Sequence, residues 1–387
     1  MSKGRKRIMK KILTILLALM LIVGLTACGG DDDASTNTDV EDAVEDAVDE
    51  VEDTVDEVTD EVEDTVDEMT DEEIDFSVAL VTDTGGIDDK SFNQGTWEGI
   101  QQFAEETGAD ITYAQSNSDA DYVPNLSTFS EEDYNLIVAP GFLFVDSMSE
   151  VSNNFPDQKF LIIDEVVAER PNVASAVFAE EQGSFLVGVA AAQATLDAGM
   201  NSVGFIGGMD FALIQKFEAG FIAGVKEVAP DMEVVVEYVG DFVSTEVAAS
   251  YASRMYDNGS YVIYHAAGGA GNGLLKEAKD RRASGEDVWA IGVDKDQYDD
   301  GVYGDNGESA VLTSMVKRVD VAAYTVAEMT MNDEFPGGET LVFTLENDGV
   351  GIPEENPNLS DEIVSLVNDY ATQIISGDII VPTVPED

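Results

Sequence analysis

Short apolar runs alternate with longer amphipathic segments from residue 76 nearly to the end of the chain. The first run, 76–81, has the length and composition of a buried strand. A polar loop follows, and a helical pattern then begins at Gly95, with Trp97, Ile100 and Phe103 on one face. Strands that alternate with helices in this way predict parallel sheets.

The same rhythm repeats through both halves of this region. Further strands are expected at 111–114, 135–139, 159–164, 173–178, 201–207, 233–238, 261–264, 288–293 and 310–314, and near 341–345 and 350–352. Helices are expected within 119–132, up to Val151, at 181–198, 211–228, 245–257 and 273–284, up to Met331, and near 361–375. A region of roughly 310 residues suits two such lobes better than one.

The first residues carry the features of a bacterial signal peptide. Six basic residues within 3–11 precede the almost wholly apolar run 12–25. This run is too short for a comfortable membrane span, and it leads into Leu25-Thr-Ala-Cys28, which looks like a lipobox. The pattern predicts a lipoprotein signal peptide over 1–27 and a diacylglycerol anchor on Cys28, the only cysteine. The alternative is an incidental cysteine behind an ordinary signal anchor.

An acidic tether is predicted over 28–75. Asp and Glu dominate it, and residues 29–75 contain no Lys, Arg or aromatic side chain. Valines recur from Val40 to Val66 at steps of three and four, which is close to a heptad pattern. Like charges oppose a helix here, so one interpretation is a self-repelling extended spacer. The other is a helical stalk that forms when salt screens the charge.

The chain is strongly acidic. Its formal net charge is −60, from 79 acidic and 19 basic residues, and the tether explains only part of that excess. Such a surface argues against nucleic acid or anionic lipid as a partner of the folded region. It also favours a salt-rich habitat, where ions screen the self-repulsion.

The loop 82–94 follows the first strand directly and has ligand-binding chemistry. It contains two glycines, three aspartates, a lysine, a serine, an asparagine and a phenylalanine. Open α/β folds bind ligands in loops at the carboxyl ends of their strands. Carboxylate and amide groups there can fix a polar ligand, and a phenyl ring can lie flat on another ring.

Several linked motifs then occur in a characteristic order. They are found at 82–94, 163–167, 181–188, 204–209, 217–221, 265–269, 291–297 and 313–320. With these motifs, roughly residues 76–380 resemble the basic membrane protein family of lipoproteins. That family resembles purine nucleoside receptors, the substrate-binding subunits of ABC transporters for nucleosides.

The resemblance implies an α/β, type I periplasmic-binding fold with two Rossmann-like lobes and hinge bending over the ligand. The chain is expected to cross between the lobes near Ala179, Ser309 and Pro336. The implied boundaries are 76–179 and 310–336 for lobe 1, and 180–309 and 337–387 for lobe 2.

The same resemblance implies which residues hold the base. Phe92 and Phe217 are expected to sandwich a purine, and Asp83 to recognise it. Asn93, beside Phe92, could donate to and accept from the base edge. Ordinary core packing is the alternative for Phe217, and loop or helix capping is the alternative for Asp83 and Asn93. Pro140 departs from the family's glycine-rich turn, which leaves the base preference open.

Asp164 and Asp294 stand where two apolar strands end, and the family places such acids on ribose hydroxyls. Carboxylates suit a diol because each accepts two hydrogen bonds. Lys317 is expected as a further ribose contact that also offsets the buried acids. Gly268 is expected to let the backbone approach the ligand.

Other chemistries find little support. The loop 268–273 imitates a dinucleotide fingerprint but does not fit its register, and His265 is the only histidine. The acidic run 294–306 does not match the spacing of an EF-hand calcium loop. No catalytic residue, metal or cofactor is therefore expected.

The sequence predicts a lipid-anchored solute-binding protein outside the cytoplasm that captures a nucleoside, and specifically a purine nucleoside, for an ABC importer. Its partners would be two permease subunits and a cytoplasmic ATPase, with the membrane reached through Cys28. One rival ligand is a sugar, another polar metabolite or a signal. A nucleotide-dependent enzyme that uses 268–273 and a surface antigen without a ligand are rival classes.

Overall fold

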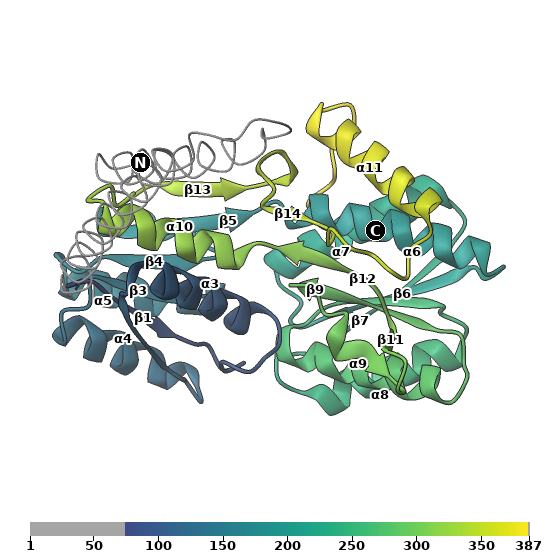
Figure 1. Ribbon diagram of the computed structural model, residues 1–387, viewed down its shortest axis with the longest axis horizontal. Helices are drawn as coiled ribbons and strands as arrows, with labels where there is room; N and C mark the ends of the chain where they lie inside the picture. The colour runs from purple at the N-terminus through teal and green to yellow at the C-terminus, as the bar shows by residue number, and fades with distance from the viewer. Residues whose placement is uncertain (1–73, 386–387) are drawn as a thin grey trace, which may run out of the picture. The chain divides into compact units, whose positions relative to one another are not determined.

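The apolar runs form two six-stranded sheets in the part of the chain that the computed structural model describes, residues 74–385 (Figure 1). Sheet A is wholly parallel. In sheet B only the edge strand β14 (Val350–Gly351) runs antiparallel to its neighbour. Sheet A has the order β13 (Thr340–Phe343), β5 (Val173–Phe178), β4 (Phe160–Ile163), β3 (Leu136–Pro140), β1 (Ser77–Val81) and β2 (Asp110–Ala114). Sheet B has the order β14 (Val350–Gly351), β12 (Val311–Lys317), β9 (Trp289–Asp294), β8 (Val262–Ala266), β6 (Ser202–Gly207) and β7 (Glu233–Tyr238).

Helices cover both faces of each sheet. Sheet A lies between α3 (Phe92–Thr107) with α10 (Val319–Met331) and α4 (Tyr122–Glu131) with α5 (Val145–Asn154). Sheet B lies between α6 (Glu180–Asp197) with α7 (Ala212–Val228) and α8 (Thr245–Asp257) with α9 (Asn272–Ala283). The last helix, α11 (Asp361–Ile375), packs on α6, and β10 (Val302–Tyr303) and β11 (Glu308–Ser309) form a small hairpin.

The first strand shows why continuous apolar runs are needed. Val78 and Leu80 face α3, where they share a core with Ile100. Ala79 and Val81 face the other side and belong to the cluster around α4. A parallel strand between two helical layers buries both of its faces, which favours an unbroken apolar run over an alternating one.

Glycines bring α6 and α7 into backbone contact. A Cβ atom at Gly220 would lie 2.2 Å from the carbonyl oxygen of Glu181, and one at Gly224 would lie 2.1 Å from that of Phe185. Only residues without a side chain permit this approach. The contact fixes the position of α7, which carries Phe217 one turn before Gly220.

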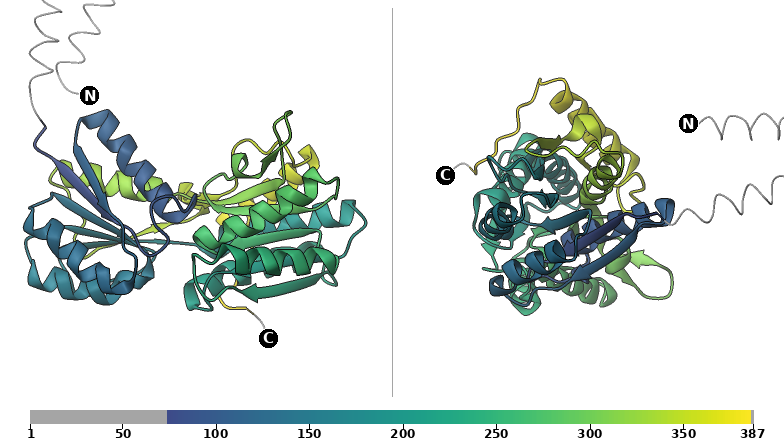
Figure 2. Two further views of the ribbon diagram at one scale, coloured as in Figure 1. Left: turned by 90° about the horizontal axis from the view of Figure 1, so that it is seen from below. Right: turned by 90° about the vertical axis from the view of Figure 1, so that its left-hand side faces the viewer.

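The chain crosses between the two sheets three times (Figures 1 and 2). It leaves sheet A after Phe178, returns after Lys317 through α10, and leaves again between Phe343 and Val350. The boundaries expected near Ser309 and Pro336 therefore differ from those of the sheets. Hydrophobic runs locate strands but do not indicate their partners: β12 pairs with β9, and β13 pairs with β5.

The helix expected from Gly95 begins three residues earlier, at Phe92, so Phe92 and Asn93 lie in the first turn of α3 rather than in a loop. The reason is Asp89, whose carboxylate accepts hydrogen bonds from the backbone N–H groups of Ser91, Asn93 and Gln94. A side chain that satisfies the free N–H groups of the first turn starts a helix.

The signal peptide predicted over 1–27, Cys28 and nearly all of the tether predicted over 28–75 lie outside the described residues. Within 74–385, no helix is both long enough and apolar enough to span a bilayer.

Candidate functional site

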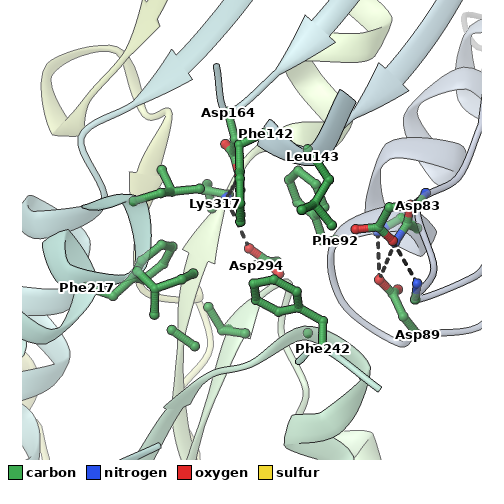
Figure 3. Close-up of a pocket in the computed structure, with 18 residues that line it drawn as sticks. Asp83, Asp89, Phe92, Phe142, Leu143, Asp164, Phe217, Phe242, Asp294 and Lys317 are labelled. Carbon is green, nitrogen blue, oxygen red and sulfur yellow. Dashed lines mark hydrogen bonds and ion pairs between the residues drawn. The ribbon is translucent and has the colours of Figure 1, made fainter. Parts of the chain in front are cut away.

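A cavity lies where the carboxyl ends of both sheets meet (Figure 3). All eight residues that the sequence nominated as ligand contacts lie on its wall: Asp83, Phe92, Asn93, Asp164, Phe217, Gly268, Asp294 and Lys317. They come from six separate segments of the chain, so only the fold brings them together. The cavity has a volume of about 60 Å³, which is room for a few water molecules.

One end of the cavity is built from two carboxylates that share one amide. Asn93 donates from Nδ2 to Oδ1 of Asp83, at 2.8 Å, and to Oδ2 of Asp89, at 3.0 Å. Its own oxygen accepts from the backbone N–H of Asp83. The amide of Asn93 therefore positions Asp83, and the base contact expected of Asn93 stays a prediction.

Asp83 presents one free oxygen to the cavity. Its Oδ1 accepts from Gly85 and Asn93, whereas no donor within the described residues reaches Oδ2. Burial raises the pKa of Asp83, and the two hydrogen bonds only partly offset that effect. Burial likewise raises the pKa of Asp89 to about 6, against four hydrogen bonds that lower it.

The middle of the cavity holds a buried ion cluster. Nζ of Lys317 lies 2.6 Å from Oδ2 of Asp164 and 3.5 Å from Oδ1 of Asp294. Asp164 follows β4 in sheet A, and Lys317 ends β12 in sheet B. The ion pair between Lys317 and Asp164 therefore joins the two sheets. Oδ1 of Asp164 is buried and accepts no hydrogen bond from the described part of the chain.

The two aspartates hold matching backbone conformations. Asp164 has φ 71° and Asp294 has φ 67°, both in the left-handed region that residues other than glycine rarely adopt. Such conformations are uncommon and concentrate at functional sites, where the surrounding structure enforces them. Strands β4 and β9 therefore end in the same way, each with a carboxylate directed at Lys317.

Electrostatic effects across this cluster are large. Burial would lower the pKa of Lys317, but the charges of Asp164 and Asp294 outweigh it and raise the pKa above its usual value. Burial raises the pKa of Asp164, and the Lys317 ammonium opposes that rise. The ammonium therefore stays charged at any physiological pH and compensates the carboxylates beside it.

Glu180 extends the cluster behind the cavity wall. It is fully buried at the start of α6, and its Oε2 pairs with Lys216 at 3.1 Å. Burial and the charge of Asp164 raise the pKa of Glu180 to about 7, against the opposing effects of Lys317 and Lys216. A proton on Glu180 near neutral pH reduces the excess of acid over base in this cluster.

Phe92 and Phe217 lie on the two sides of Lys317 (Figure 3). The ammonium is 4.6 Å from the ring centroid of Phe92 and 5.3 Å from that of Phe217. Phe217 is almost fully buried and belongs to the hydrophobic core, which agrees with the alternative of core packing. It also lines the cavity. Both rings thus face a common space.

The glycine-rich loop forms a short 3-10 helix, 268–271, ahead of α9. Gly268 has φ 51° and lies against Phe242, so a side chain there would be strained. Gly271 leaves no room for a Cβ atom, which would lie 2.0 Å from Nδ1 of His265.

His265 is buried and structural. Oε1 of Gln297 accepts from the backbone N–H of Val293 and lies 3.1 Å from Nε2 of His265, so Nε2 carries the proton in this pair. The amide group of Gln297 donates to the backbone oxygen of Lys90, across the two sheets. Burial lowers the pKa of His265 to about 4, with the Gln297 bond opposing the change.

His265→Gln tests this assignment through pH dependence. The folded pKa of about 4 lies below the ordinary 6.5, so the unfolded chain takes up a proton that the native protein does not. The free energy of unfolding of the wild type should therefore fall relative to that of the variant by about 2 kcal/mol between pH 7 and pH 5. Urea titrations at both pH values measure this, and a constant difference would contradict a neutral buried His265.

Ten further residues line the cavity, among them Asp89, Phe142 and Phe242. Asp89 lies in the nominated loop but was not distinguished from its neighbour Asp88. Phe142 lies two residues after the end of β3, and Phe242 lies four residues after the end of β7. Both therefore belong to the connections at the carboxyl ends of strands, where open α/β folds bind their ligands.

Further contacts join the two sheets around the cavity. Lys90 pairs with Asp300 at 2.7 Å, and Lys295 pairs with Glu98 at 2.6 Å. Ser91 donates a short hydrogen bond to Asp294. The segment that carries Asp89 and Phe92 is thus bound directly to sheet B.

A family model described as "ABC transporter substrate-binding protein PnrA-like" matches residues 76–384. The CD4+ T-cell-stimulating antigen of Listeria innocua is 44% identical over 321 residues, which cover 80% of this chain and 89% of that protein. The ABC transporter nucleoside-binding protein BmpA of Lactococcus lactis is 39% identical over 319 residues, which cover 80% of this chain and 90% of that protein.

The crystal structure of an ABC transporter solute-binding protein from Aeropyrum pernix K1 matches with a TM-score of 0.71 and 29% identity. The match covers 81% of this chain and 94% of that chain. An arabinose-binding protein from Geobacillus stearothermophilus, at 12% identity and a TM-score of 0.54, shares the fold alone, over 75% of this chain and 99% of that one. These similarities confirm the type I periplasmic-binding fold predicted from the sequence.

Proposed function

Since this chain belongs to the family of PnrA-like ABC transporter substrate-binding proteins, we propose that it captures a nucleoside, specifically a purine nucleoside, outside the cytoplasm for an ABC importer. The importer partners would be two permease subunits and a cytoplasmic ATPase. A relative that is 39% identical bears the name of a nucleoside-binding protein, which supports this choice of ligand class.

The observation that carries the proposal is the arrangement of two phenyl rings and a buried carboxylate pair around one cavity. Phe92 and Phe217 both face Lys317 and supply flat apolar surfaces for a base. Asp164 and Asp294 flank the same ammonium and can each accept hydrogen bonds from a sugar diol. Asp83, with a free oxygen at the far end, can accept from an N–H group of the base.

Capture requires the two sheets to separate. The cavity of about 60 Å³ is too small for a nucleoside, and Lys317 lies between the two rings. Ion pairs and hydrogen bonds across the sheets hold this closed arrangement. Opening at the three crossover segments would admit the ligand, and reclosure would bring Lys317 and both carboxylates onto the sugar.

Titration calorimetry tests the ligand class. Inosine, guanosine and adenosine are compared with cytidine and ribose, and NAD is included because of the glycine-rich loop. Binding of purine nucleosides that exceeds the binding of ribose supports the proposal. A preference for ribose or another sugar would favour the rival ligand class, binding of NAD alone would favour a nucleotide-dependent protein, and no binding at all would favour a surface antigen.

We also propose that the signal peptide is removed and that Cys28 carries the lipid that holds the protein at the cell membrane. The lipobox-like Leu25-Thr-Ala-Cys28 and the lipoprotein named among the relatives support this anchor. Cys28→Ser should release the protein from the membrane fraction, because the anchoring acyl chains are then absent. Fractionation with immunoblotting measures this, and retention of the variant equal to that of the wild type would contradict it.

A further inference from the structure

Three phenyl rings meet across the gap between the sheets. Phe142 follows β3 of sheet A, whereas Phe211 and Phe242 follow β6 and β7 of sheet B. The Phe142 and Phe211 rings stack with centroids 4.6 Å apart and planes at 9°. Phe242 approaches Phe142 edge-on, with centroids 6.1 Å apart at 72°.

Two of these rings belong to the cavity wall, and the third extends to the protein surface. Phe142 and Phe242 line the cavity and enter from its two sides (Figure 3). Phe211 does not line the cavity, and 44% of its surface is exposed to solvent. The stacked pair therefore runs from the cavity wall outward to the surface.

The backbone on both sides holds these rings in place. Gly141 has φ 117°, a conformation open to glycine, and it turns the chain from β3 to Phe142. On the other side, a Cβ atom at Gly208 would lie 2.3 Å from the Phe242 ring. The turn that carries Phe242 is fixed by Asp241, which accepts hydrogen bonds from the backbone of Val243 and Ser244.

We propose that Phe142, Phe211 and Phe242 form an aromatic gate, which closes the cavity mouth and determines how long a ligand is retained. The other direct contacts between the sheets described above are polar and weaken in salt when exposed. Aromatic stacking does not depend on screening, and such a pair contributes about 0.5–1.5 kcal/mol beyond the area it buries. The retention role rests on the proposed ligand capture, but closure by the gate does not.

Phe211→Ala isolates the gate, because Phe211 does not line the cavity but stacks on Phe142, which does. Opening should become easier, while entry into the open form is unaffected. In stopped-flow experiments with inosine, the dissociation rate constant should therefore rise about 3- to 10-fold, with the association rate constant within about twofold of the wild type. Phe211→Tyr, which keeps the stacking ring, should restore slow dissociation.

Tyr113→Ala provides the matched control. Tyr113 lies on the edge strand β2, is 42% exposed, and makes an edge-on aromatic pair with Trp97. Its loss removes a comparable aromatic contact away from the gate, and dissociation should stay at the wild-type rate. An unchanged rate in Phe211→Ala, or an equal rise in Tyr113→Ala, would overturn the proposal.

A measurement without ligand separates the gate from the proposed function. Spin labels on Asp146→Cys of α5 and Glu246→Cys of α8, in full-length protein with Cys28→Ser, report the distance between the two sides of the mouth. If the gate holds the closed form, Phe211→Ala should add longer distances to the distribution. An identical distribution with and without Phe211 would overturn the gate whether or not any nucleoside binds.

Discussion

Lys317→Met should lower the free energy of unfolding by about 3–5 kcal/mol and abolish detectable nucleoside binding. The side chain is 2% exposed and is the ammonium partner of both Asp164 and Asp294. Removal of one partner of a buried ion pair leaves an uncompensated charge in a low-dielectric environment. Urea denaturation and calorimetry with inosine measure the two effects.

The pH dependence of Lys317→Met provides an internal check. Without the ammonium, the pKa of Asp164, which burial already raises, should rise further. A raised folded pKa means that the native variant takes up protons more readily than the unfolded chain, so the variant should regain stability as the pH falls. Lys295→Met removes a more exposed ion pair with Glu98, and it should lower the free energy of unfolding by less than about 1 kcal/mol. Equal losses in the two variants would contradict the central role of Lys317.

Asp294→Ala should weaken inosine binding about 10- to 100-fold, because hydrogen bonds to a charged group contribute about 1.5–3 kcal/mol. The carboxylate is buried, lies on the cavity wall and has Lys317 as its cation. A ribose-modified ligand sharpens the test. The wild type should bind 2′-deoxyinosine more weakly than inosine, whereas Asp294→Ala should bind the two ligands with similar affinity.

Asp300→Ala is the control for Asp294→Ala. Asp300 also belongs to an ion pair between the two sheets, with Lys90, but Lys90 is about half exposed and Asp300 does not line the cavity. Its removal should change inosine affinity less than about threefold. Unchanged affinity in Asp294→Ala would show that the carboxylate does not contact the ligand.

The strand pattern and most of the cavity wall could be predicted because both depend on local signals. Runs such as 160–163 and 290–293 are buried on both faces, so they can be recognised as strands without knowledge of their neighbours. The acids that terminate them, Asp164 and Asp294, are conspicuous against an apolar background. Parallel sheets collect such residues at one edge, which is how positions far apart in the sequence came to be grouped.

Sequence reasoning failed where the answer depended on pairing. The second and third crossovers were misplaced because β12 and β13 look alike as apolar runs, although β12 joins sheet B and β13 joins sheet A. The hydrogen-bond partners of Asn93 could not be predicted for a similar reason. Its amide is occupied by Asp83 and Asp89, and residue type alone does not indicate that both partners lie within 3.0 Å.

Apolar cavity residues were the hardest to anticipate. Phe142 and Phe242 carry no polar signal, and a phenylalanine after a strand usually packs in the core. Their role depends on the spacing between the sheets, which places Phe142 against Phe211. Aromatic residues within a few positions of a strand's carboxyl end are therefore worth the same scrutiny as acids in folds of this class.

A crystal structure of the protein with inosine tests the central claim most directly. The account predicts the purine between the rings of Phe92 and Phe217, and the ribose hydroxyls on Asp164 and Asp294, with Lys317 beside them. Bound inosine elsewhere on the protein, with both rings still packed in the interior, would contradict it.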